Sequence, residues 1–359
     1  MQNINQFIPM LDLLAQPAFA VNNGKIIYSN EAARNLMILP EKDVTSLLRT
    51  GQEEYPAFQD GTLHLTLDLC GKVVEATVVS MEDTHLFISE DSNSSEQLQA
   101  MALASQQLRT PLSDMITAAD RLFPMEELKN SKAAQRQIAQ MNRSLHQLMR
   151  LVGNMSDAAR YAEMPDSNMV TIDVSAFFDE VIEKAASLLQ QADMHLQYQG
   201  LSAPVYTLAD AERLERAIYN LISNAVKFSP KGSIVKATLT QNKGLLSFTL
   251  HDHGEGLAAQ VRANVFNRFT RQPGLYDHRF GAGLGLNIVH NTATAHGGTV
   301  LLESPADGGS KITITIKLRH SENVIVRSHP FLIDYAGGHD HGLLELSDVL
   351  PTHLYENLY

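Results

Sequence analysis

The sequence has little of the chemistry that marks a secreted or membrane-spanning protein. It has a single cysteine, Cys70, which cannot form an internal disulfide and has no metal-binding companions nearby, so we expect a small buried hydrophobe there. No apolar run reaches the roughly 18 residues of a membrane span. The first ten residues, MQNINQFIPM, lack the basic and apolar segments of a secretory signal. We therefore expect a cytoplasmic location and no membrane span.

Basic residues are also scarce. The chain has 28 lysines and arginines against 40 aspartates and glutamates, which gives a formal net charge of -12. A polyanionic surface repels nucleic acid and anionic lipid, so neither is an expected partner. Hydrophobic residues make up 44% of the chain and charged residues 19%, which is typical of globular proteins. A chain of 359 residues is long enough for two or three domains.

Residues 1–90 mix short helical and strand patterns. The segment AFAVNNGKIIYSN predicts two strands joined by a hairpin turn at Asn22-Asn23-Gly24. In LHLTLDL a leucine recurs at every second position from Leu63 to Leu69, which predicts a half-buried antiparallel strand. VVEATVV and HLFISE read as further strands. The segment predicts a small α/β sensor and resembles a PAS domain, most closely in AQPAFAVNNGKIIYSNEAARNLM.

Residues 91–165 predict a helical hairpin that follows a polar linker, DSNSSEQ. Both helices carry apolar residues at alternating spacings of three and four, which is the pattern of a heptad seam. The first seam consists of Leu98, Met101, Ser105, Leu108, Leu112, Met115, Ala119 and Leu122. The second consists of Ile138, Met141, Leu145, Leu148, Val152 and Met155. One hairpin has too little core to be stable alone, so we expect a homodimer in which two antiparallel hairpins form a four-helix bundle.

Residues 166–320 alternate helices and strands and predict an α/β sandwich. Helices are expected at 174–191, 209–228 and 283–296, and strands at SIVKATLT, LSFTLHD, GTVLLES and KITITIKL. The fold class is therefore multidomain α+β, with this sandwich after the sensor and the hairpin. Residues 321–359 form a C-terminal extension with an amphipathic stretch, LLELSDVL, and no fold partner can be assigned to it from the sequence.

A polar stripe lies on the helix expected in ERAIYNLISNAVKFSP. Asn220, Asn224 and Lys227 are spaced i, i+4 and i+7, which places them on one helix face. Two amides and an amine are poor core material. They suit a magnesium ion and phosphate oxygens, because hard cations take oxygen ligands and lysine supplies a point charge.

Two glycine-rich segments follow in order. Asp252-His-Gly254-Glu-Gly256 comes directly after a strand, where the carboxylate can accept a hydrogen bond from an exocyclic amine and the glycines allow close approach to a flat ring. The glycines Gly281, Gly283 and Gly285 then lead into a helix, which is the arrangement of a phosphate-binding loop. Each segment alone is a weak signal, whereas the three in this order and context are a strong one.

With these three segments, the chain resembles the sensor histidine kinases of two-component systems. Their ATP-binding domain has the fold shared with gyrase and Hsp90. The N box of that family matches NLISNAVKF, the G1 box DHGEG and the G2 box GAGLGL. The F box matches VFNRFTR, with Phe266 and Phe269, for which ordinary packing is an equal explanation. Arg271 falls where the family often carries a lid cation. The resemblance implies ATP as ligand, with Mg2+ bound at Asn224.

One residue separates subfamilies of this fold. At the position of Asn220 the gyrase-like ATPases carry a glutamate that activates water. An amide cannot act as a general base near neutral pH. Asn220 therefore favours a kinase-type site, in which ATP is spared from hydrolysis.

The segment Ala104-Ser-Gln-Gln-Leu-Arg-Thr-Pro-Leu112 resembles the H box of the same family, but its two chemical positions differ. Gln106 stands where the phosphate-accepting histidine is expected, and Gln107 stands at the neighbouring acid. A carboxamide nitrogen has its lone pair in resonance with the carbonyl and is no practical nucleophile, unlike an imidazole nitrogen. We therefore predict a pseudokinase that cannot phosphorylate itself.

Other histidines are poor substitutes for the missing one. His146 flanks the seam of the second helix, and we expect a surface histidine there. His339 and His341 have metal-ligand spacing, but they lie in a glycine-rich turn and favour an ordinary turn over a metal site.

Three functions stay open from the sequence. The chain is an ATP-binding signalling protein whose bundle geometry a partner reads, or a phosphatase of a response-regulator aspartyl phosphate, or a kinase acting on the histidine of a partner histidine kinase in a heterodimer. Phosphatase members of the family orient water with a side chain one turn after the histidine, and Thr110 has that place here, at i+4 from Gln106.

Overall fold

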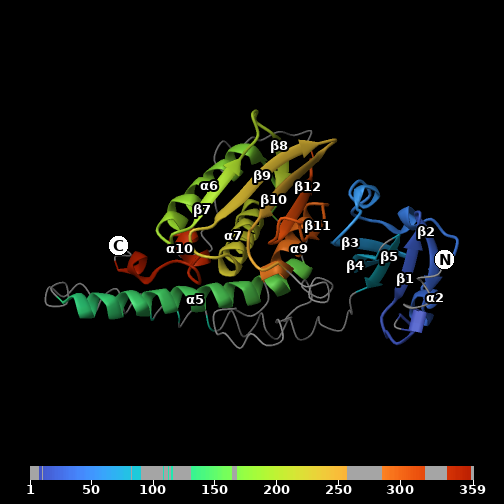
Figure 1. Cartoon of the computed structure of the whole chain (residues 1–359), viewed down its shortest axis with the longest axis horizontal. Coiled ribbons are helices and arrows are strands. Elements are labelled where there is room, and N and C mark those ends of the chain that lie inside the picture. The colour runs from blue at the N-terminus through green and yellow to red at the C-terminus, as the bar shows by residue number, and fades with distance from the viewer. Residues whose placement is uncertain are drawn as a thin grey trace.

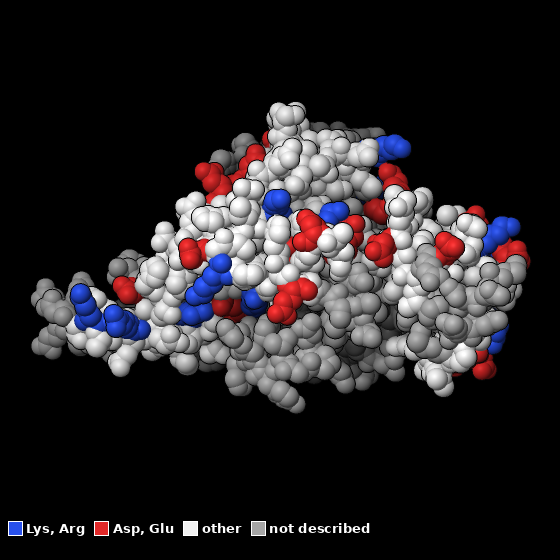
Figure 2. All heavy atoms as spheres, in the orientation of Figure 1, with Lys and Arg blue, Asp and Glu red and all other residues white. Residues whose placement is uncertain are grey.

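The structure is a computed structural model of the whole chain. It describes residues 8–9, 11–81, 83–89, 108, 112, 115, 131–163, 168–256, 285–319 and 338–356. Within this part of the chain, no helix combines the length and apolar composition needed to cross a membrane. Acidic and basic side chains are interspersed over the face seen in Figure 2, with several basic groups at the left of the view.

The N-terminal unit is an antiparallel five-stranded sheet in the order β2-β1-β5-β4-β3 (Figure 1). Its strands and main helix are β1 (Ala18–Asn22), β2 (Lys25–Ser29), α2 (Glu31–Asn35), β3 (Thr62–Leu69), β4 (Lys72–Met81) and β5 (Thr84–Ser89). Two 3-10 turns, Val44–Leu47 and Tyr55–Ala57, lie between α2 and β3. The predicted β-hairpin turn between β1 and β2 is confirmed. Asn23 and Gly24 both have positive φ, as a tight two-residue turn requires.

The expectation of a buried cysteine is wrong. Cys70 is exposed in the tight turn between β3 and β4, where it has a φ of 58°. The turn reverses the chain at the end of the two strands, so it projects this side chain out of the apolar core. Its sulfur is 3.8 Å from the Leu36 carbonyl oxygen.

A single long helix, α5 (Lys132–Glu163), confirms the second helix of the predicted hairpin. Leu145 and Val152 of its seam are buried, whereas Leu148 is 44% exposed. From the first predicted helix the structure describes only Leu108, Leu112 and Met115, all helical.

The C-terminal unit places helices against strands through one continuous apolar core. Its elements are β6 (Val170–Asp173), α6 (Val174–Gln190), β7 (His195–Gln199), β8 (Tyr206–Ala209), α7 (Ala211–Phe228), β9 (Ile234–Asn242), β10 (Leu245–His251), α9 (Gly285–Ala295), β11 (Val300–Glu303) and β12 (Lys311–Lys317). Strands β11, β12, β10, β9 and β7 are neighbours in that order, and β6 pairs separately with β8. The α/β arrangement predicted for residues 166–320 is confirmed in these elements.

The two sheets are joined into one sheet of ten strands, because β3 pairs with β11. Leu63 lies opposite Leu301 in this antiparallel register. The prediction of a half-buried β3 is wrong, since Thr62, His64 and Thr66 on its other face are buried as well. These polar residues are covered because β3 is an inner strand of the joined sheet and α9 packs near it.

A pair of buried histidines lies where the two units meet. His64 of β3 and His290 of α9 have ring centroids 5.8 Å apart, and each is no more than 2% exposed. Thr77 Oγ1 is 3.0 Å from His64 Nδ1, and Glu75 lies 3.7 Å from His290. Burial, with a smaller contribution from His290, holds the pKa of His64 well below its ordinary value.

Acidification is therefore expected to weaken the fold. Since the pKa of His64 is depressed in the folded state, the unfolded chain binds more protons below pH 6.5. Stability is full above that pH and falls as the pH drops, by up to about 1.4 kcal/mol per pH unit for this one group. Urea unfolding between pH 7.5 and 5 should show a shallower loss for His64→Gln than for the wild type. Equal slopes for the two proteins would contradict the prediction.

The C-terminal extension, for which no fold partner could be assigned from the sequence, packs on the rest of the chain. Helix α10 (His341–Glu345) and the 3-10 turn Thr352–Tyr355 contact α5, and α10 also contacts α6 and α7. Leu346, Leu350 and Tyr355 are fully buried in the core of the C-terminal unit. We refer to residues 338–356 as the tail.

Candidate functional site

Helix α7 carries the predicted polar stripe and is buried along most of its length. It begins at an Asp210 cap, whose carboxylate accepts a hydrogen bond from the Arg213 amide at 3.1 Å. Its apolar face lies in the core, and α9, α10 and α6 pack against the helix. Polar side chains on its second face are consequently buried between helices and must find partners there.

The three predicted stripe residues have different surroundings. Asn220 is 2% exposed. Its amide nitrogen donates to the Arg216 carbonyl at 2.8 Å, and its side-chain oxygen accepts from Arg150 Nη2 at 3.2 Å. Asn224 is half-buried one turn later. Lys227 is half-buried, and its amine donates to Asp348 Oδ2 at 2.7 Å. Burial, and then Arg150, lower the pKa of Lys227.

The predicted G1 residues form a tight turn after β10. Asp252 is 6% exposed, and its Oδ1 accepts from the amides of Gly254 at 2.9 Å and Ser310 at 3.2 Å. Burial raises the pKa of Asp252, and these two amides oppose that rise. Gly254 is required here, because a Cβ would lie 2.4 Å from the Phe228 carbonyl oxygen.

The structure brings the predicted segments together around α7. The close contact of Gly254 with Phe228 places the G1 turn at the end of this helix. The start of α9 meets the same helix, since a Cβ on Gly285 would lie 2.8 Å from Asn220 Oδ1. Gly256 belongs to the same turn and has a φ of 73°. A buried carboxylate, two amides, an amine and a helix N-terminus therefore converge in one region of the molecule.

Several predicted residues lie outside the described part of the chain. These are Gln106, Gln107, Thr110, Phe266, Phe269, Arg271, Gly281 and Gly283.

The sequence did not identify three charged residues beside the stripe, of which Arg150 and Asp348 contact it directly. Arg150 of α5 donates to Asn220 and, at 3.3 Å, to Ser223 Oγ. Glu345 and Asp348 of the tail pair with Arg150 at 3.3 and 2.7 Å. The one available signal was the pair of acidic residues in LLELSDVL, an amphipathic stretch with no partner.

The expectation that His146 is a surface residue is wrong. Its side chain is fully buried, with ring centroids 5.1 Å from His339 and 5.2 Å from Tyr355. The tail covers this side of α5, which the helix pattern alone could not show. Burial lowers the pKa of His146. His339 thus packs on His146, while His341 Nδ1 lies 2.9 Å from Glu215, so each histidine has a separate neighbour.

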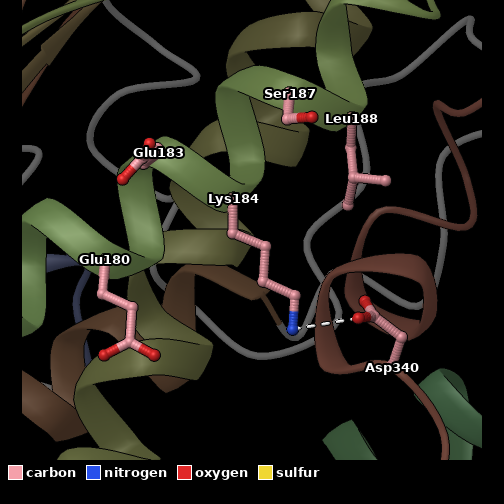
Figure 3. Close-up of a pocket in the computed structure, with 6 residues that line it drawn as sticks. All are labelled: Glu180, Glu183, Lys184, Ser187, Leu188 and Asp340. Carbon is pink, nitrogen blue, oxygen red and sulfur yellow. Dashed lines mark ion pairs between the residues drawn. The ribbon is translucent and has the colours of Figure 1, made fainter.

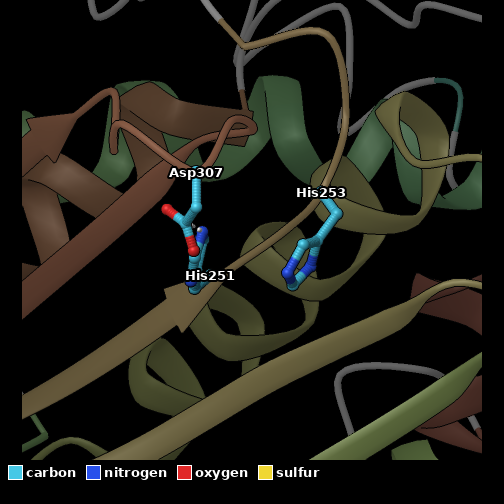
Figure 4. Close-up of side chains that lie close together, drawn as sticks. All are labelled: His251, His253 and Asp307. Carbon is cyan, nitrogen blue, oxygen red and sulfur yellow. Dashed lines mark ion pairs between the residues drawn. The ribbon is translucent and has the colours of Figure 1, made fainter.

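A second cluster lies beside the G1 turn. His251, His253 and Asp307 bring three ligand atoms within 4.8 Å of one another (Figure 4). The two imidazoles stack at 4.9 Å, and His253 Nδ1 is 3.1 Å from the Ile234 carbonyl oxygen. They flank the buried Asp252 along an extended segment, whose successive side chains point to opposite sides. The cluster is therefore on the outer surface of the turn, apart from the Asp252 site.

Comparison with known proteins agrees with this geometry. Residues 209–320 match the family described as histidine kinase-, DNA gyrase B- and HSP90-like ATPase. The chain is 29% identical over 227 residues to hybrid signal transduction histidine kinase D of Dictyostelium discoideum, covering 61% of this chain and 15% of that protein. It is 30% identical over 212 residues to the histidine-protein kinase/phosphatase MprB of Mycolicibacterium vanbaalenii, covering 58% of this chain and 43% of the relative.

A solved structure is similar as well. The crystal structure of full-length ShkA in complex with AMPPNP has a TM-score of 0.50 and 25% identity, covering 62% of this chain and 46% of that one. The chain thus spans less than half of the length of each of these three proteins.

Proposed function

Since residues 209–320 carry an ATPase domain of this family in a chain related to the sensor histidine kinases of two-component systems, we propose that the protein is an ATP-binding signalling pseudokinase. The observation that carries the ATP site is the convergence of Asp252, Asn220 and the start of α9 around one helix. The loss of self-phosphorylation rests on Gln106 and Gln107 in place of the nucleophile and the base.

Asp252 would recognise the adenine ring. Its Oδ1 is held by two backbone amides, which fix the carboxylate and leave Oδ2 as an acceptor for an exocyclic amine. Asn220 has no basic lone pair and already uses both amide atoms in hydrogen bonds, so it cannot activate water. ATP is therefore expected to stay intact in this site.

The residues expected to face the phosphates of the nucleotide are suited to bind magnesium and phosphate. Asn224 offers an amide oxygen, the ligand type that Mg2+ prefers, and would hold the ion. Lys227 lies one turn further along α7 and supplies a positive charge to phosphate oxygens. The start of α9 lies beside Asn220, and the amides of a helix N-terminus favour phosphate. The bound ion would supply charge neutralisation of the phosphates.

The N-terminal unit is the proposed sensor. Its five-stranded antiparallel sheet with short helices before β3 supports the PAS-like interpretation. The pairing of β3 with β11 gives it a direct backbone connection to the ATP-binding unit. A ligand that shifts this sheet would therefore act on α9, which packs near both β3 and β11.

A homodimer is supported by apolar side chains that the single chain leaves uncovered. Leu108, Met115 and Leu148 occupy predicted seam positions and are 48%, 52% and 44% exposed. Exposed apolar residues at heptad positions are typical of a helix that packs against a second copy. Light scattering should give the mass of two chains, and the mass of one at micromolar concentration would contradict this.

Incubation with γ-labelled ATP tests the pseudokinase proposal. The wild type should carry no acid-labile label, because no nucleophile stands at position 106. Gln106→His combined with Gln107→Glu should gain label, since it restores an imidazole and a proton acceptor. The variant Gln107→Glu alone is the matched control and should stay unlabelled. Labelling of the wild type would refute the proposal.

A further inference from the structure

The carboxylate of Asp348 lies against two cations next to the polar stripe of α7. Its Oδ2 accepts from Arg150 Nη1 and from Lys227 Nζ, both at 2.7 Å. Arg150 comes from α5, Lys227 from α7 and Asp348 from the tail, so three elements far apart in sequence meet at one oxygen. The side chains are 6%, 12% and 21% exposed in that order. Such a charge-assisted contact is strong because little water competes for it.

Arg150 and Asp348 belong to a larger cluster of buried charges. Arg150 also pairs with Glu345 at 3.3 Å, and Glu345 pairs with Arg216 at 3.2 Å. Burial alone would raise the pKa of Asp348, but Arg150 and Lys227 outweigh it and lower that pKa. The pKa of Lys227 is lowered as well, since burial and Arg150 together outweigh the attraction of Asp348. The two cations therefore keep the Asp348 carboxylate ionised.

The same cations belong to the nucleotide site. Lys227 is the stripe residue expected to contact phosphate, and Arg150 hydrogen bonds Asn220 of the same stripe. A phosphate oxygen and the Asp348 carboxylate are both anions that require the same donors. Two anions cannot share these donors without strong repulsion, so binding of one disfavours the other.

We propose that Arg150 and Lys227 form an anion subsite for a phosphate of the bound nucleotide, and that Asp348 fills this subsite as a competitor built into the chain. The proposal rests on the proposed ATP-binding function. It adds Arg150 of the long helix to the phosphate-binding residues, and it gives the tail the role of lowering nucleotide affinity.

The remaining contacts of the tail hold the segment around Asp348 in place. Before it, α10 is held by the ion pair of Lys184 with Asp340 at 3.0 Å, on the wall of a pocket beside α6 (Figure 3). After it, Tyr355 is fully buried and donates to the Leu343 carbonyl at 2.8 Å. The Asp348 segment is thus anchored on both sides, so its release needs only local movement.

Nucleotide affinity of the full chain tests the proposal. Titration with Mg-AMPPNP should show about tenfold or more tighter binding for Asp348→Asn than for the wild type, because the amide frees both cations. Adding Arg150→Gln to Asp348→Asn should remove most of that gain. Glu356→Gln is the matched control, since it removes an exposed carboxylate of the same tail that contacts neither cation and should bind as the wild type does. Equal affinity of Asp348→Asn and the wild type would overturn the inference and leave ATP binding standing.

A measurement on the wild type keeps the test independent of mutant folding. Saturating Mg-AMPPNP should speed hydrogen exchange of the amides in residues 341–355, because the tail loses its central ion pairs. Unchanged or slower exchange in this segment, with nucleotide bound, would overturn the inference. Absence of nucleotide binding in the wild type and in Asp348→Asn alike would overturn the proposed function and this inference together.

Discussion

Replacing Asp252 by asparagine is expected to weaken adenine-nucleotide binding by about 100-fold or more. The asparagine oxygen can keep the hydrogen bonds from the amides of Gly254 and Ser310, so the turn should stay folded. Its amide nitrogen then faces the exocyclic amine of adenine. Both groups are hydrogen-bond donors, so no hydrogen bond can form between them. Losing a charged acceptor and leaving an unsatisfied group costs roughly 3 kcal/mol, which is about 100-fold in affinity. Isothermal titration with Mg-ATP measures the effect.

The neighbouring histidine provides the control for this substitution. His253→Asn changes an exposed side chain on the outer surface of the same turn and should leave nucleotide affinity within about twofold of the wild type. Equal affinity of Asp252→Asn and the wild type would show that the adenine site lies elsewhere.

Replacing Arg216 by methionine is expected to lower the free energy of unfolding by about 3–5 kcal/mol. The guanidinium is 2% exposed and pairs with two buried carboxylates, Asp157 and Glu345, so its loss leaves both without this partner. Breaking one side of a buried ion pair is costly because the remaining charge has lost its compensation. Urea unfolding followed by circular dichroism measures the loss.

An ion pair at the surface provides the comparison. Lys184→Met removes the partner of Asp340, where both side chains are about 40% exposed, and should change stability by less than about 1 kcal/mol. If Arg216→Met were as stable as Lys184→Met, the buried cluster would not hold α5, α7 and the tail together.

Local patterns predicted the secondary structure well because they depend on neighbouring residues alone. The alternation in KITITIKL predicted β12, and the seam from Ile138 to Met155 predicted α5. The order of the three glycine and amide segments predicted that they belong to one candidate site. Asn220, Asp252 and Gly285 are indeed brought around one helix.

Contacts between distant segments could not be predicted from these patterns. The burial of His64 depends on the pairing of β3 with β11, whose residues are more than 230 positions apart. His146 is buried because the tail covers it. Arg150 and Asp348 resemble solvated charges in the sequence, since only the fold places them beside Lys227. A single sequence carries no local signal for such pairings.

These contacts also relate the proposed sensor to the nucleotide site. His290 lies on α9, the helix whose start meets Asn220, and it packs on His64 of the N-terminal unit. Arg150 lies on α5 and contacts the same Asn220. The occupancy of the nucleotide site is therefore expected to be coupled to both the sensor and the long helix.

The most direct measurement of the central claim is the fate of ATP after it binds. The wild-type chain is titrated with Mg-ATP and isolated with its ligand. The complex is then denatured, and the released nucleotide and the protein are analysed by mass spectrometry. We predict about one nucleotide per chain, recovered as ATP, and a protein mass without added phosphate. Absence of bound nucleotide, or recovery of ADP together with a phosphorylated chain, would contradict a pseudokinase that holds ATP without using it.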